Sequence, residues 1–145
     1  MFNSKKFVIR SRGIILNEGK LLLVRNTSSQ KHTSLPGGKL EWGEDAVECL
    51  KREIEEELGI QPAVGRLLYI HTYTEGSTQA MEFFFEVTNG GDYVNRADQK
   101  PTHAHEISEV IWAGPGDEVN LLPEALARDL KAGALLSDIP RFIKG

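Results

Sequence analysis

Residues 37–60 read GGKLEWGEDAVECLKREIEEELGI, and this stretch decides how the 145-residue chain is interpreted. Two adjacent glycines open it and leave the backbone there nearly bare of side chains. From Asp45 to Leu58 the apolar residues recur at helical spacing, and Gly59 stands where a glycine commonly ends a helix. We therefore expect a helix over residues 45–58, with Asp45 as its cap or its first residue.

Three glutamates share one side of this expected helix. At about 100° per residue, Glu53, Glu56 and Glu57 fall in one sector about 100° wide, which flanks the apolar stripe. Like charges at this spacing destabilise a helix, and a hard cation such as Mg²⁺ or Mn²⁺ would turn the repulsion into coordination. Arg52 is the basic residue placed to offset them, four residues after Glu48 and four before Glu56. Taken alone, a glutamate-rich helix is more often a solvated face, so the wider segment decides.

The wider segment resembles the Nudix box, which reads Gly, five residues, Glu, seven residues, Arg-Glu-aliphatic-any-Glu-Glu-any-Gly-aliphatic. Its nine defined positions are matched here by Gly38, Glu44, Arg52, Glu53, Ile54, Glu56, Glu57, Gly59 and Ile60. From average residue usage, such a match has a chance probability on the order of one in a billion per start position. The chain is therefore similar to the Nudix hydrolase family of MutT-like proteins.

This resemblance implies a fold and a set of roles. Family members fold as an α/β/α sandwich around a mixed sheet, with the box forming a loop-helix-loop, and hydrolyse nucleoside diphosphates linked to another group X. By position, the metal ligands would be Glu53, Glu56, Glu57 and the carbonyl of Gly37. Arg52 would orient the carboxylates and Glu44 would support the loop, whereas Gly38 and Gly59 would be structural.

The catalytic base is less easily placed. One carboxylate must accept the proton of the attacking water, and family members differ in whether it lies inside the box or on a distant loop. Glu53 and Glu106 are the two contenders, and Glu109 is a weaker third. We prefer Glu106, which ends a long polar stretch just before the last expected strand, because Glu53 is committed by its spacing to the metal cluster. An exposed glutamate at a strand end is the alternative for Glu106.

Several other residues attract attention. Cys49 lies one turn before Glu53, where packing near the site is a simpler role than catalysis. His103 and His105 form a His-x-His pair that could ligate a metal, although a solvated loop explains them as well. Three aromatic rings alternate along one strand and could either stack on a base or pack in the core: Tyr69, His71 and Tyr73.

Outside the box the chain reads as strands and one more helix. Strands are expected over residues 6–16, 21–24, 65–74, 80–88 and 107–113, the first two as a hairpin, and a second helix over 123–132. Residues 26–34 and 89–105 are expected as loops. This pattern predicts a single α/β domain over residues 1–145, with helices packed on a mixed sheet.

Composition restricts the function classes. The formal net charge of −4 argues against a nucleic-acid polymer as partner, and the single cysteine excludes an intrachain disulfide. Neither a signal peptide nor a membrane-spanning stretch is recognisable, so we expect no membrane partner and a reducing compartment, the cytoplasm.

Substrate and assembly stay open in the sequence. Markers of the ADP-sugar, dinucleoside-polyphosphate, NADH and coenzyme A branches are not evident, which by elimination favours a nucleoside triphosphate or related nucleotide as the small-molecule substrate. One alternative is a nucleotide-sensing module with the Nudix fold that does not catalyse. Another is an interaction protein whose glutamates are only surface. A homodimer is one of the open assembly states.

Overall fold

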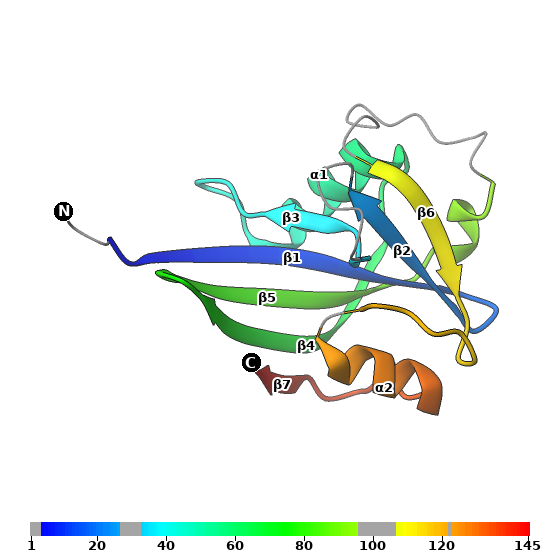
Figure 1. The fold of residues 1–145 in the computed structure, drawn as a ribbon. Coiled ribbons are helices and arrows are strands. Elements are labelled where there is room, and N and C mark those ends of the chain that lie inside the picture. Colours follow the sequence, from blue (N-terminus) through cyan, green and yellow to red (C-terminus); the bar gives the residue numbers. More distant parts are fainter. Residues whose placement is uncertain (1–3, 27–32, 96–106, 122) are drawn as a thin grey trace.

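The fold is known from a computed structural model that describes residues 4–26, 33–95, 107–121 and 123–145. The elements follow one another as β1 (Lys6–Asn17), β2 (Lys20–Asn26), β3 (Gly37–Lys39), α1 (Ala46–Leu58), β4 (Val64–Glu75), β5 (Thr78–Val87), the 3-10 helix η1 (Gly90–Tyr93), β6 (Ile107–Ala113), α2 (Glu124–Ala132) and β7 (Arg141–Lys144). Seven strands form one sheet in the order β6-β2-β1-β5-β4-β7, with β3 paired to the side of β1 (Figure 1).

The sheet is mixed, as expected. Strand β1 runs parallel to β5, and β4 runs parallel to β7. The other neighbours, including the expected β1–β2 hairpin, are antiparallel. No helix in the described part of the chain is long and apolar enough to cross a membrane.

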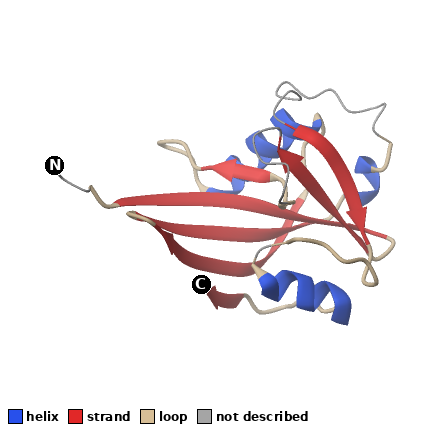
Figure 2. Ribbon diagram, in the orientation of Figure 1, coloured by secondary structure: helices blue, strands red, loops and turns tan. Residues whose placement is uncertain are grey.

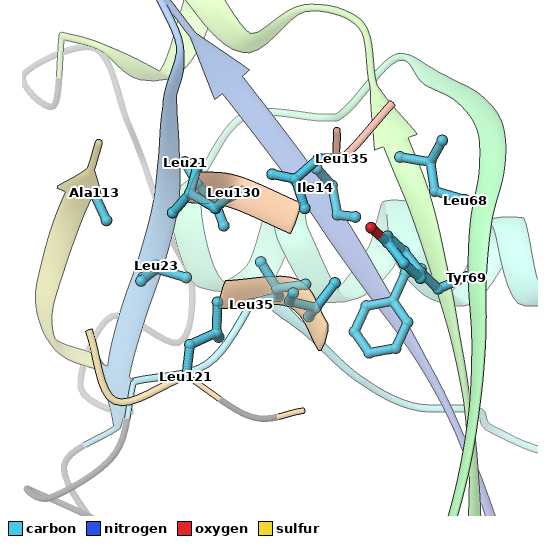
Figure 3. Packing of buried hydrophobic residues seen from close by; sticks show 12 residues of the cluster. Ile14, Leu21, Leu23, Leu35, Leu68, Tyr69, Ala113, Leu121, Leu130 and Leu135 are labelled. Carbon is cyan, nitrogen blue, oxygen red and sulfur yellow. The ribbon is translucent and has the colours of Figure 1, made fainter. Parts of the chain in front are cut away.

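In the part of the chain that the structure describes, each face of the sheet carries one α-helix. Ile14 packs in a buried cluster with Leu126 of α2, whereas its neighbour Ile15 packs in a second cluster with Leu50 and Ile54 of α1. Successive side chains of a strand point to opposite faces, so the two helices must lie on opposite sides of the sheet. Figure 2 shows this arrangement, and Figure 3 shows the cluster on the α2 side. The expected α/β/α sandwich is therefore confirmed.

Local signals set the ends of the helices. Asp45 caps α1 rather than beginning it: its side chain accepts the backbone N–H of Glu48, and the Glu48 side chain accepts the N–H of Asp45. This reciprocal pair satisfies donors that the first helical turn leaves free. Gly59 ends the helix in the left-handed conformation. Pro123, expected as the first residue of α2, lies immediately before it.

Three short elements were not expected from the sequence. Strand β3 contains two glycines and three residues in all, and its extended form comes from pairing with Arg10–Arg12 of β1. Strand β7 pairs in parallel with Tyr69–Thr72 of β4. The 3-10 helix η1 lies at the start of the expected loop over 89–105, whose residues from 96 onward lie outside the described part. Local pattern misses such elements because their stability comes from distant partners.

Candidate functional site

Arg52 organises the acidic side of α1. Its Nε donates to Glu44 Oε2 at 2.7 Å and its Nη2 donates to Glu44 Oε1 at 3.0 Å. Its Nη1 donates to Glu53 at 2.8 Å and to Glu56 at 3.3 Å. A second Nη2 hydrogen bond reaches the carbonyl of Lys39 at 3.0 Å. One guanidinium therefore ties the loop before α1, the strand β3 and two carboxylates of the helix together.

These contacts refine the expectation for Arg52. The contact with Glu56, one helical turn away, is present, but Glu48 is engaged in the helix cap and not with Arg52. The main partner is Glu44, which supports the loop as the resemblance implied. The Arg52 hydrogen bonds hold the pKa of Glu44 below its usual range, so this carboxylate is ionised. The same pair raises the pKa of Arg52, which keeps its charge at any physiological pH.

The two glycines that open the segment are needed for different reasons. Gly37 has φ of +142°, and a Cβ there would lie 2.0 Å from the carbonyl oxygen of Ser11 in the neighbouring strand. A Cβ on Gly38 would instead lie 2.5 Å from the carboxyl group of Glu53. Gly37 thus allows β3 to pair with β1, and Gly38 leaves the space that the Glu53 carboxylate occupies.

Cys49 holds β3 against the helix. Its Sγ lies 3.5 Å from the carbonyl of Gly38, and nearby Ser11 Oγ donates to the carbonyl of Ala46 at 2.7 Å. Burial raises the pKa of the Cys49 thiol. A buried, protonated thiol is a packing residue and not a nucleophile, in keeping with the simpler of the two expectations.

The three glutamates expected as metal ligands lie on one side of α1, but their carboxylates do not gather into one group. Glu53, Glu56 and Glu57 are all partly buried. The first two face Arg52, and Gly37 precedes the glycine against which Glu53 packs. Among the residues that the structure describes, no three His, Cys, Asp or Glu side chains form a group that could hold a metal ion. The ligand assignment therefore stays a prediction.

The candidate bases fare differently. Glu106, with His103 and His105, lies outside the described residues. Glu109 lies on β6 opposite Arg25 of β2, and its carboxylate forms an ion pair with that arginine. Glu53 is likewise paired, with Arg52, so the choice of the base stays a prediction.

The three alternating rings of β4 divide between core and cavity. Tyr69 is buried, donates to Asp129 at 2.5 Å and has the guanidinium of Arg141 over its ring at 3.9 Å, so it belongs to the core. His71 and Tyr73 are stacked, with ring centroids 4.8 Å apart, and both line a cavity.

This cavity, of about 720 Å³, lies on the α2 side of the sheet. Leu35, Phe84 and the first turn of α2 also line it, together with the charged pair Arg12 and Glu82. Burial alone would raise the pKa of Glu82, but the hydrogen bond with His71 and the charge of Arg12 outweigh it and lower the pKa. Neither Arg12 nor Glu82 was expected from the sequence to lie at a site. Two glutamates, Glu82 and Glu86, interrupt the otherwise apolar run Met81–Val87, and this was the signal that could have found Glu82.

An α/β/α sandwich with an arginine-centred acidic helix defines the class of domain to which this chain belongs. A family model described as NUDIX domain matches residues 8–133, and the chain is therefore a member of that family.

Three known proteins illustrate the similarity. The 8-oxo-dGTP diphosphatase of Haemophilus influenzae is 38% identical over 89 residues, which are 59% of this chain and 65% of the relative. The ADP-ribose pyrophosphatase of Methanocaldococcus jannaschii is 34% identical over 84 residues, 54% of this chain and 50% of the relative. The MutT protein of Methanosarcina mazei Go1 has a crystal structure that superposes with a TM-score of 0.69 at 26% identity, covering 90% of this chain and 95% of that one. The chain thus spans less than two thirds of the length of both curated relatives.

Proposed function

We propose that this chain is a metal-dependent pyrophosphohydrolase that cuts a phosphoanhydride bond in a nucleoside diphosphate linked to X. The observation that carries this proposal is the contact of one guanidinium with Glu44, Glu53 and Glu56. These contacts hold a row of carboxylates beside the glycine segment, and Glu53 packs directly against Gly38. The relatives named as a diphosphatase and a pyrophosphatase support it.

The donor set suits a hard divalent cation. Glu53, Glu56, Glu57 and the carbonyl of Gly37 offer only oxygen, the ligand type that Mg²⁺ and Mn²⁺ prefer. Gly38 has no side chain, so the Glu53 carboxylate can pack directly against it. A Cβ at this position would occupy the same space as that carboxylate. When bound, the metal would neutralise charge on the phosphate oxygens and acidify a water molecule.

The chain's own residues would do the remaining work. Arg52 would keep Glu53 and Glu56 in place through its Nη1 hydrogen bonds, and Glu44 would keep Arg52 in place. We propose that Glu106 accepts the proton of the attacking water, with Glu53 as the alternative base. Glu53 already accepts a hydrogen bond from Arg52 at 2.8 Å, and its position in the box commits it to the proposed metal cluster.

A purine nucleoside triphosphate or related nucleotide is the proposed substrate. Both curated relatives are named for purine nucleotides, 8-oxo-dGTP and ADP-ribose. The cavity on the α2 side has the volume of a small-molecule site. Leu35 lines this cavity. The glycine pair Gly37 and Gly38 begins two residues further along the chain, and Gly38 contacts Glu53.

A substrate panel tests the proposal. Purified protein would be incubated with canonical and 8-oxo nucleoside triphosphates, and with ADP-ribose, in Mg²⁺, in Mn²⁺ or in EDTA. Nucleoside monophosphate, phosphate and pyrophosphate would be quantified. We expect metal-dependent release of a monophosphate from at least one purine compound. Tight, metal-dependent binding without any product across the panel would instead identify a nucleotide-sensing module.

A further inference from the structure

Helix α1 covers only part of its side of the sheet, and apolar side chains stay exposed beside it. Phe7 and Phe142 are each 80% exposed, and Ile9 and Met81 are each 38% exposed. Figure 1 shows the start of β1 and the turn between β4 and β5 extending past both helices. We call these four residues, which come from β1, β5 and β7, the open face.

The strand register makes the open face one continuous surface. Ile9 lies beside Met81 of β5. In the next row Phe83 lies beside Ile70 of β4, and Ile70 lies beside Phe142 of β7. Residues paired across strands, and alternate residues along one strand, point to the same side of a sheet. Because Phe83 packs against the cluster under α1, this surface lies on the α1 side.

The open face has the size of the apolar part of a protein interface. A continuous apolar surface of more than a few hundred Å² usually marks an interaction site. Phe7 and Phe142 alone expose about 300 Å², because an aromatic side chain has an area of about 150–250 Å². Ile9 and Met81 add to this, and a standard interface needs about 450 Å² of apolar area from each partner.

The two ends of the open face carry opposite charges. At the β1 end, the N–H of Leu40 donates to the carbonyl of Ile9 at 2.9 Å, and the side chain of the next residue, Glu41, is 67% exposed. At the β7 end, Lys144 is exposed and stands two residues after Phe142, on the same side of the sheet. The surface is therefore acidic at one end and basic at the other.

Such a surface is complementary to itself. A second copy, turned by 180° about an axis parallel to the strands and lying face to face, would place its β7 over β1 of the first copy. Phe142 of each copy would then cover Phe7 and Ile9 of the other, and Lys144 would approach Glu41. A two-fold axis makes both sets of contacts at once.

We infer that the open face is the contact surface of a homodimer and that its occupant is a second copy of this chain. The area suits a standard interface, and the charge at each end matches the opposite end of a second copy. The dimer goes beyond the proposed function and does not depend on it, because association needs neither metal nor nucleotide.

Sedimentation velocity of the purified chain over a range of concentrations tests the inference. We expect a monomer–dimer equilibrium in the micromolar range or tighter. Phe142→Glu should weaken association by at least about 30-fold, the effect typical of a central aromatic residue. Val94→Glu is the matched control. Val94 is 52% exposed next to Tyr93, which packs at the far end of α1, so this variant should associate like the wild type.

Two results would overturn the inference: a wild type that stays monomeric at every concentration, or a folded Phe142→Glu variant that associates like the wild type. Phe7→Glu, on a different strand, covers the case in which Phe142→Glu does not fold. If the monomeric wild type also floated with phosphatidylserine vesicles, the open face would belong to a lipid surface instead.

Thiol crosslinking tests the orientation of the two copies. The chain has one cysteine, Cys49, which is buried, so Ile9→Cys and Phe142→Cys each introduce one accessible thiol. A bismaleimide with a span of about 10 Å, the spacing of packed sheets, would be added to each variant and to their mixture. We expect a crosslinked dimer chiefly in the mixture. Equal crosslinking of Phe142→Cys alone would place β7 on β7 and contradict the proposed arrangement.

Discussion

The guanidinium of Arg52 grips Glu44 through two hydrogen bonds, Nε to Oε2 at 2.7 Å and Nη2 to Oε1 at 3.0 Å. Glu44 lies in the loop before α1, eight residues from Arg52, so this fork joins loop and helix. The third nitrogen of the guanidinium, Nη1, donates hydrogen bonds to Glu53 and Glu56. Geometry of this kind fixes both partners, because a planar fork matches a carboxylate in only one orientation.

Glu56→Gln and Glu57→Gln should each lower turnover at low Mg²⁺ by about two orders of magnitude, because each removes a charge on the proposed metal face while keeping its shape. Initial rates measured against Mg²⁺ concentration check this. Glu55→Gln, on the exposed side of the same helix, is the control and should match the wild type. Wild-type turnover of both test variants at low Mg²⁺ would refute the assignment of α1 as the metal site.

Arg52→Ala should weaken Mn²⁺ binding and lower kcat/KM together, each by about 10- to 100-fold, since residues that orient metal ligands have effects of this size. Arg52→Lys should restore only part of the Mn²⁺ affinity and of kcat/KM, because an ammonium cannot reproduce the two-pronged contact with Glu44. Mn²⁺ titration and steady-state kinetics give the two readouts. If both variants were fully active, Arg52 would be an ordinary surface residue.

Glu106→Gln should lower kcat by about 100-fold or more with little change in metal dependence, as expected for a general base. Glu53→Gln should change metal dependence as well as rate. The measurement is a pH–rate profile of each variant at saturating metal. A near-normal kcat and an unchanged acidic limb in Glu106→Gln would assign the base to Glu53.

Alanine at the two adjacent glycines should separate folding from function. Gly37→Ala forces a Cβ against a backbone oxygen at positive φ, and we expect a loss of about 1–3 kcal/mol or more in the free energy of unfolding. Gly38→Ala meets the mobile end of the Glu53 side chain, so the protein should fold while turnover falls. Urea unfolding and kinetics of both variants provide the comparison. The idea fails if Gly38→Ala retains full activity or if Gly37→Ala is as stable as the wild type.

The pair of Glu44 and Arg52 should make stability depend on pH. Arg52 lowers the pKa of Glu44 in the folded state, so ionised Glu44 stabilises the fold above the unfolded pKa of about 4.3. That contribution is lost as the pH falls through the lower folded value. Urea unfolding of wild type and Glu44→Gln from pH 7 to pH 3 should give a difference that shrinks below about pH 4.3. A difference that stays constant over this range would contradict the linkage.

Much of α1 could be predicted from the sequence because its determinants are local. Hydrophobic spacing, the Asp45 cap and Gly59 act within a few residues of each other, and helical geometry then places Glu53, Glu56 and Glu57 on one side. The expected strands surrounding two helices predicted a mixed sheet with helices packed on it.

The tertiary structure alone decided which distant groups meet. Glu44 became the main partner of Arg52 through the path of the loop, which no helical wheel describes. The antiparallel register of β4 and β5 sets His71 opposite Glu82, and the parallel neighbour β1 brings Arg12 to the same carboxylate. Sequence spacing says nothing about such pairs, because a shift of one residue in strand register would turn every side chain to the other face of the sheet.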